Sequence, residues 1–331
     1  MKKLIKLALV LTMVLSLLAC SVASAKTLTW KSSTLGNEEL AQTQGIFEFK
    51  RVLEEVSGGT IKLDAFINGT LYNQSAATDA ILAGDLEFNL STFGFLGTLY
   101  APANMFGKAY NFNDYDHFVA FLNSEAYQKF SKNVDEHAGV HIVSMWYNGA
   151  RTLNPKWAEP VMTPEDLKGK ILRTPNNPGM INMGEALGAT VSPIDFGELY
   201  TALQMGTVDA EENSLPQIKA GNFHEVTEQV TLTNHQIEII PLIVPIDFWN
   251  GLTEEQQAWV NEAAEAGRVK CDTMNIESEK SLAAWFEEQG IVVVTPDLAA
   301  FQAYAANYYE TNNLMADWDM DLYNALMELA K

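Results

Sequence analysis

The stretch KGKILRTPNNPGM, residues 168–180, has the pattern of a strand followed by a helix. A glycine typical of a turn precedes residues 170–174, which read as a short strand, and a proline then ends the strand's pairing. Asn177 and Pro178 are typical of an N-cap with proline in the first turn of a helix. This order predicts that Arg173 lies at the carboxyl end of the strand, the edge at which open α/β sheets bind ligands.

Strand and helix patterns alternate on both sides of this stretch. We expect strands at residues 27–33, 60–66, 86–92, 140–150, 189–195, 208–214, 237–246 and 291–296, and helices at 38–56, 73–83, 177–187, 196–204, 253–286 and from 298 onward. This alternation predicts a parallel sheet with helices on its faces. Residues 237–246 are almost all apolar, which predicts a buried crossover strand. The helix that opens at Thr253 has a Thr-Glu-Glu-Gln capping box.

The length and composition favour two domains with ordinary hydrophobic cores. The chain has 331 residues, of which 47% are apolar and 19% are charged. Such values are typical of globular rather than disordered proteins. The sequence contains no internal repeat, low-complexity tract or linker. We therefore expect an α/β fold with two lobes, between which the chain crosses more than once.

The net charge of −21 argues against polyanionic partners. The chain has 21 Lys and Arg residues against 42 Asp and Glu residues. It therefore repels phosphate backbones and anionic membrane surfaces at long range, and we expect no nucleic-acid binding. An anionic ligand would need local positive charge, and two of the four arginines, Arg151 and Arg173, lie in the middle of the chain.

Residues 1–25 are predicted to be a secretory signal peptide. They combine a basic start, an apolar run too short to span a membrane and an Ala-Ser-Ala cleavage site at residues 23–25. A second interpretation is a lipobox at residues 17–20, which would place a lipid anchor on Cys20. Either route leads to the periplasm or another extracytoplasmic space. No later run reaches membrane-spanning length, so we expect no direct membrane insertion of the mature chain.

The motifs of common catalytic sites are absent from the sequence. It has no GxGxxG, Walker, GxSxG, HExxH or CxxC motif, and cleavage would leave Cys271 as the one cysteine. A glycine separates His137 from His141, and we interpret both as surface or capping residues rather than metal ligands. Glu211 and Glu212 would point to opposite faces of a strand. We therefore expect no catalysis, no cofactor and no metal.

From residue 146 to about residue 235 the chain resembles the DctP-type solute-binding proteins of TRAP transporters. These are the extracytoplasmic subunits of tripartite, ATP-independent importers of organic acids. The similarity lies in YNGARTL (147–153), PEDLKGKILRTPNNP (164–178), EALGATVSPIDFGELYTALQMGTVDAEENSL (185–215) and TNH (233–235). The resemblance implies two α/β lobes with a cleft between them and a long helix against both. We assign residues 26–148 and 239–278 to lobe I, and residues 149–238 and 279–331 to lobe II.

The resemblance also implies roles for individual residues. Arg173 matches the family arginine that binds the carboxylate of the solute, and Arg151 matches a second arginine that often contacts the ligand. Asn213 matches an asparagine that hydrogen-bonds the carboxylate region, and Phe196 matches an aromatic residue that packs on the ligand. A guanidinium group suits this task because its planar fork meets a carboxylate bidentately, which lysine cannot do.

The first lobe departs from the branch of the family that binds sialic acid. That branch carries a charged pair after the third strand, whereas residues 90–96 read LSTFGFL and contain no charge. Thr92 and Phe93 in this segment are candidate ligand contacts, as are Asn73 and Glu39 near other contact positions of the family. An aromatic face with neutral polar groups suits a sugar acid such as a uronate, or a 2-oxo or hydroxy acid.

Three other functions fit parts of this pattern. A C4-dicarboxylate would fit if Arg151 bound its second carboxylate. An ABC-type binding protein would have a similar fold but a different membrane partner, and an extracytoplasmic enzyme is disfavoured by the missing motifs. We adopt the interpretation of a binding protein that captures a small organic carboxylate and delivers it to the TRAP integral membrane subunits.

Overall fold

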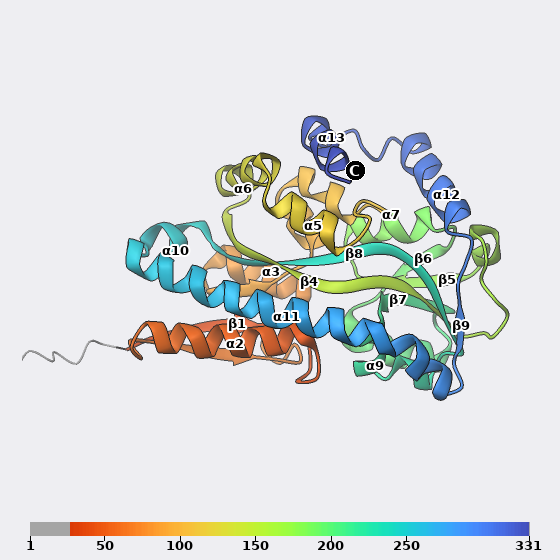
Figure 1. Cartoon of the computed structure of the whole chain (residues 1–331), viewed down its shortest axis with the longest axis horizontal. Helices are drawn as coiled ribbons and strands as arrows, with labels where there is room; N and C mark the ends of the chain where they lie inside the picture. The colour runs from red at the N-terminus through yellow and green to blue at the C-terminus, as the bar shows by residue number, and fades with distance from the viewer. Residues whose placement is uncertain (1–26, 331) are drawn as a thin grey trace, which may run out of the picture.

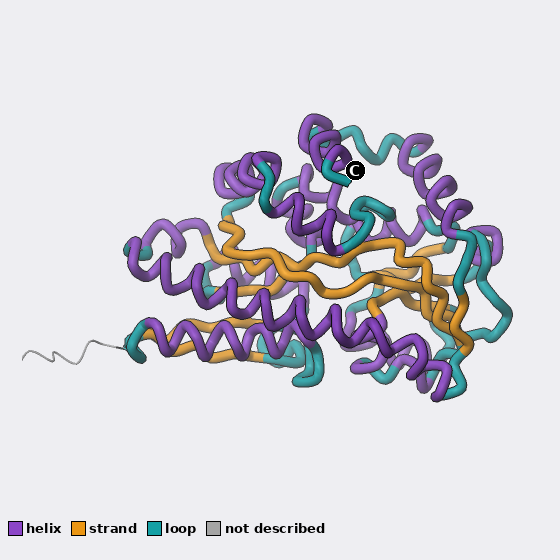
Figure 2. The backbone as a smooth tube through the Cα atoms, in the orientation of Figure 1, coloured by secondary structure: helices purple, strands orange, loops and turns teal. Residues whose placement is uncertain are grey.

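A single mixed sheet runs through the molecule. The computed structural model describes residues 27–330, so the predicted signal peptide and Cys20 lie outside the described part. The strand order is β2-β1-β3-β8-β4-β7-β5-β6, and β9 pairs with β8. The strands are β1 Leu28–Ser33, β2 Ile61–Phe66, β3 Phe88–Leu90, β4 Val140–Pro155, β5 Ile171–Thr174, β6 Thr190–Pro193, β7 Ala210–Ser214, β8 Gln229–Pro245 and β9 Val292–Val294. Figure 2 shows them between helices on either side.

Each end of the sheet is a parallel α/β unit. At one end β1 pairs in parallel with β2 and β3, and at the other β5 pairs in parallel with β6 and β7. The long strands β4 and β8 pair with each other in antiparallel orientation and connect the two halves. The predicted two-lobe α/β fold is confirmed, while the residue boundaries that we assign to the lobes stay a prediction.

Helices cover both faces of this sheet (Figure 1). The α-helices are α2 Ala41–Val56, α3 Gln74–Ala83, α4 Phe93–Leu99, α5 Tyr115–Leu122, α6 Glu125–His137, α7 Pro178–Ala186, α8 Leu199–Met205, α9 Leu215–Ala220, α10 Ile246–Gly251, α11 Glu254–Glu288, α12 Leu298–Thr311 and α13 Met320–Glu328. Short 3₁₀ helices lie at η1 Ala101–Gly107, η2 Pro164–Leu167, η3 Phe196–Glu198 and η4 Phe223–Glu225. Among the described residues, no helix has the length and apolar character needed to cross a membrane.

The helix α11 spans both halves of the molecule. Its predicted capping box is present, because Oγ1 of Thr253 accepts from the backbone N–H of Gln256 and the Gln256 side chain accepts from the backbone N–H of Thr253. Along its 35 residues it packs against α2 and β4, then against α9 and β9. Figure 1 shows it running along the whole front of the sheet. The predicted long helix across both lobes is therefore confirmed.

Two of the differences from the sequence-based expectation have a clear structural reason. The crossover strand β8 begins at Gln229 rather than at residue 237, because its polar first half is buried through side-chain hydrogen bonds of residues such as Thr231 and His235. The helical C-terminal region is divided into α12 and α13. Asn313, which has a φ of 53°, lies between these helices, and Asp319 caps α13.

The helices α2 and α11 meet at a pair of glycines. A Cβ atom added at Gly267 of α11 would lie 2.8 Å from the carbonyl oxygen of Gly45 on α2 and 2.8 Å from the ring of Trp146. One added at Gly45 would lie 2.8 Å from the carbonyl oxygen of Gly267. Trp146 is fully buried beneath this crossing. The helices can therefore approach this closely only because both positions lack a side chain.

We expect Gly267→Ala to lower the free energy of unfolding by about 1–3 kcal/mol, because the added methyl group meets a backbone atom and a buried ring. An exposed helical glycine would give the opposite sign, since alanine is the better helix former. Gly251→Ala is the matched control, because a Cβ there meets nothing within 4 Å, and we expect a change within about 0.5 kcal/mol. Urea denaturation measures both, and an unchanged Gly267→Ala midpoint would contradict the close packing.

Candidate functional site

A cavity that is partly open to solvent lies between the two halves of the sheet. It is lined from the first half by Thr34, Leu35, Leu40, Gln42, Gln74, Leu90, Ser91 and Thr92, and from the crossing strands and second half by Asn148, Arg151, Arg173, Pro175, Phe196, Asn213, Gln217, Glu238 and Ile240. Its walls are therefore apolar and neutral polar, except for two arginines and one glutamate.

Arg173 presents a guanidinium group with unused donors to this cavity. It lies near the carboxyl end of β5, and its Nε donates to the carbonyl oxygen of Ile194, just past the end of β6, at 2.8 Å. Nη1 is buried and has no hydrogen-bond partner within residues 27–330. Burial lowers the pKa of Arg173 to about 10, although Glu212 and Glu211 oppose the shift. The side chain is only 1% exposed, and no carboxylate of residues 27–330 forms an ion pair with it.

Arg151 is in the opposite situation, because its donors are almost all used. Nε and Nη2 donate to the carboxylate of Glu212 at 2.5 and 2.8 Å, Nη2 also donates to the Glu212 carbonyl oxygen, and Nη1 donates to Glu238 at 2.7 Å. Burial lowers the pKa of Arg151, but these two carboxylates outweigh it and the net shift is upward. A guanidinium has five N–H donors, so Arg151 has one left for a ligand.

A bulge in β4 brings Asn148 and Arg151 to the same cavity. The register with β8 shifts by one residue between Tyr147 and Ala150. Side chains three apart on a regular strand point to opposite faces, and the extra residue reverses that alternation. Gly149 occupies the bulge with a φ of 100°, and a Cβ there would lie 2.6 Å from the side chain of Ser214. Only glycine meets both conditions.

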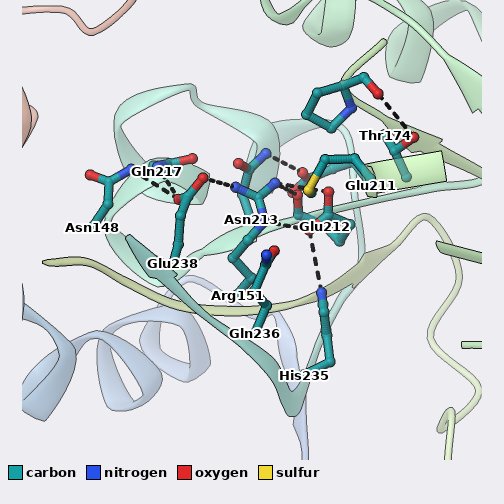
Figure 3. A network of polar contacts seen from close by, with 12 residues as sticks. Asn148, Arg151, Thr174, Glu211, Glu212, Asn213, Gln217, His235, Gln236 and Glu238 are labelled. Atoms are coloured by element: carbon teal, nitrogen blue, oxygen red, sulfur yellow. Dashed lines mark hydrogen bonds and ion pairs between the residues drawn. The ribbon is translucent and has the colours of Figure 1, made fainter. Parts of the chain in front are cut away.

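The adjacent glutamates of β7 have different partners. Glu212 accepts from Arg151 and contacts Nε2 of His235 at 3.3 Å, whereas Glu211 accepts from Nδ2 of Asn213 at 2.6 Å (Figure 3). Burial raises the pKa of Glu211 to about 8, and the neighbouring Glu212 charge adds to the shift. Burial acts in the same direction on Glu212, but Arg151 and His235 reverse it and lower the pKa of Glu212. Burial lowers the pKa of His235, against the pull of Glu212.

The structure brings five of the eight predicted contacts to the cavity, namely Arg173, Arg151, Asn213, Phe196 and Thr92. Phe196 is half-buried, and its ring lies edge-on to the ring of Phe223 at 5.7 Å. The Oγ1 atom of Thr92 is buried and has no partner in the described part of the chain. Both side chains are therefore placed to contact a molecule in the cavity.

The other three predicted contacts lie elsewhere. Phe93 is buried in the hydrophobic core and stacks on Phe106 at 4.4 Å. Glu39 is exposed and lines a separate surface hollow. Asn73 caps α3 through its Oδ1 and donates from Nδ2 to Asp195, the residue before η3 in the second half, at 3.0 Å.

Sequence reasoning missed the polar residues that support the arginines. Glu238 and His235 belong to the buried polar network of β8, and Asn148 and Gln217 belong to β4 and α9. The apolar pattern of residues 237–246 has a single charged member, Glu238, which is the signal that could have marked it as functional. No cluster of His, Cys, Asp or Glu suited to a metal ion occurs among the residues the structure describes.

Comparisons with known proteins agree with this architecture. The family model for bacterial extracellular solute-binding protein, family 7 (DctP), matches residues 32–314. The chain is 29% identical over 286 residues to the sialic acid-binding periplasmic protein SiaP of Vibrio cholerae, a match that covers 86% of this chain and 87% of SiaP.

Solved structures give the same result. A TRAP periplasmic solute-binding protein of Roseobacter denitrificans with bound 3-deoxy-D-manno-oct-2-ulosonic acid superimposes with a TM-score of 0.87 and 31% identity, over 92% of this chain and 99% of the other. A second R. denitrificans TRAP protein, with bound β-D-glucuronate, superimposes with a TM-score of 0.83 and 28% identity, over 90% of this chain and 98% of the other. These matches confirm the resemblance found in the sequence, and the chain belongs to the bacterial extracellular solute-binding protein family 7, the DctP family of TRAP transporter proteins.

Proposed function

We propose that this protein captures a small organic monocarboxylate, of the sugar-acid type, and delivers it unchanged to the integral membrane subunits of a TRAP transporter. The observation that carries the proposal is the buried guanidinium of Arg173, which lines the cavity and whose Nη1 has no partner among the described residues. A carboxylate placed there would gain charge-assisted hydrogen bonds where water is excluded. The protein binds without catalysis, in the periplasm or another extracytoplasmic space.

The pairing of the cavity charges supports a single carboxylate. Arg151 is paired directly with Glu212 and Glu238, and the raised pKa of Glu211 favours its neutral form near neutral pH. Arg173 is then the cation without a direct carboxylate partner among the described residues, and the carboxylate of one ligand can pair with it. A C4-dicarboxylate would need a second free cation, and Arg151 has one donor left.

The relatives support the chemical class of the ligand. Two similar TRAP proteins are described with a bound ulosonic acid and a bound uronate, and both acids combine one carboxylate with several hydroxyl groups. The neutral amides and hydroxyls of this cavity suit such a molecule. We assign Arg173 as the carboxylate anchor, Asn213 and Arg151 as supporting donors, Thr92 as a hydroxyl contact and Phe196 as the apolar contact.

Arg173→Met tests the anchor. Loss of a buried charged partner should weaken binding of D-glucuronate by about 2–5 kcal/mol, roughly thirtyfold or more. The free energy of unfolding without ligand should change by less than about 1 kcal/mol, because removing a buried, poorly bonded charge offsets the lost bond to Ile194. Calorimetric titration and urea denaturation measure the two effects. Binding within about threefold of wild type would refute the anchor, whereas a thermal shift by non-acids alone would refute the carboxylate class.

Glu211→Gln tests whether Glu211 is neutral in the folded protein, through the pH dependence of the free energy of unfolding. A carboxyl group with a raised pKa keeps a proton in the folded state that the unfolded chain loses near pH 4, so its contribution makes stability fall as pH rises to about 8. The free energy of unfolding of the variant should not show this fall, so the slopes of the two proteins against pH should differ by up to about 1.4 kcal/mol per pH unit. Urea denaturation between pH 6 and 8 measures the slopes. Parallel curves for the two proteins would contradict a neutral Glu211.

Asn73→Asp tests whether the bond to Asp195, which joins the two halves, contributes to binding. Aspartate is as good an N-cap as asparagine, so α3 keeps its cap, but the variant loses the donor and places two carboxylates together. Because Asn73 is exposed, we expect D-glucuronate to bind only about two- to fivefold more weakly. Asn73→Ser keeps the cap without adding charge and should have a smaller effect. Wild-type affinity in both variants would remove Asn73 from the site.

A further inference from the structure

The carboxylate of Glu238 is the point at which three other cavity side chains meet. Its Oε1 accepts from Nη1 of Arg151 at 2.7 Å, and its Oε2 accepts from Nδ2 of Asn148 at 2.9 Å and from Nε2 of Gln217 at 3.0 Å. All four residues are at most 7% exposed and line the cavity. Figure 3 shows Asn148, Gln217 and Arg151 converging on Glu238 from β4 and α9.

This arrangement fixes which end of each amide is free. A carboxylate paired with a guanidinium has only acceptors, so Asn148 and Gln217 must both turn their NH₂ groups toward Glu238. Their carbonyl oxygens then point away from it, and neither oxygen accepts a hydrogen bond from the described residues. The cavity wall next to Arg151 therefore offers two amide oxygens, which are acceptors.

We propose that Glu238 is a positioning residue that makes Asn148 and Gln217 acceptors for hydroxyl groups of the bound acid. The inference rests on the proposed function and narrows it to polyhydroxylated monocarboxylates. A sugar hydroxyl donates a proton to such an oxygen, whereas a second carboxylate has none to donate at neutral pH. By holding one donor of Arg151, Glu238 also reduces what that arginine can offer to a second carboxylate.

The same geometry predicts that the site binds sugar acids more tightly than acids without hydroxyl groups. A cavity built with buried acceptors loses affinity for a molecule that cannot supply the donors, because the acceptors then stay without partners. Succinate combines a carboxylate able to bind Arg173 with a second carboxylate in place of hydroxyl groups. Wild type should therefore bind D-galactonate or D-glucuronate more tightly than succinate.

Glu238→Gln tests the role of the carboxylate. A glutamine there can donate as well as accept, so the neighbouring amides are no longer held in one orientation, and Arg151 loses one of its two carboxylate partners. We expect the dissociation constants of D-galactonate and D-glucuronate to rise at least tenfold. The ratio of the succinate constant to the galactonate constant should fall more than tenfold, which a merely structural defect would not cause.

Glu54→Gln is the matched control. Glu54 is also a partly buried glutamate that accepts hydrogen bonds, from Nζ of Lys62 and the backbone N–H of Leu63, but it lies neither at the cavity nor on the connecting strands. Its replacement should leave the ratio of the two constants unchanged. Calorimetric titration gives the constants, and circular dichroism reports whether each variant is folded.

Gln217→Met is the alternative test if Glu238→Gln does not fold. It keeps the side-chain volume and removes the acceptor, and we expect the ratio of the succinate constant to the galactonate constant to fall at least fivefold. An unchanged ratio in the folded variants, or a wild type that prefers succinate, would overturn the inference while the Arg173 anchor stands. If wild type binds none of the three acids, the proposed function fails and the inference fails with it.

Discussion

The buried guanidinium of Arg173 is the constraint around which the site is organised. A charge removed from water without a partner is costly, and its unused donors add to that cost. The parallel strands β5 and β6 hold it through a single bond to the carbonyl oxygen of Ile194. The cost is offset when an anion enters, so a closed cavity is more favourable with an acid bound than without one.

The two arginines of the cavity have different roles because their surroundings differ. Arg151 has two carboxylate partners, and these partners in turn hold His235, Asn148 and Gln217. It therefore acts mainly as the centre of a buried polar network. Arg173 has no direct carboxylate partner among the described residues, and its charge is left for the ligand. An acidic protein can hold an anion in this way because a short-range pair in a dry cavity outweighs a screened long-range field.

The sequence allowed the local elements to be predicted, together with the position of Arg173 near the carboxyl end of its strand. The strand of residues 170–174, the cap at Asn177 and the capping box at Thr253 depend on neighbours in the chain, and each is present. The polar part of β8 and the role of Glu238 depend on partners 60 or more residues away, such as Thr152 and Arg151. A single sequence does not specify those pairings, because periodicity reports which face is buried and not what lies against it.

The bulge at Gly149 could not be predicted for the same reason, and it determines how the polar network is built. The residue is an ordinary turn glycine by sequence, and only the register between β4 and β8 makes it a bulge. The strands that carry Arg151, Asn148 and Glu238 also connect the two halves, and α11 crosses beside them and binds the bulge through Glu279 at the backbone N–H of Ala150. Arg173 lies on β5, outside this connection. The polar network around Glu238 is therefore assembled across the connecting strands β4 and β8 together with the adjacent β7 and α9, which supply Glu212 and Gln217. The bulge in β4 determines which side chains of this network face the cavity, because it places Asn148 and Arg151 on the same side.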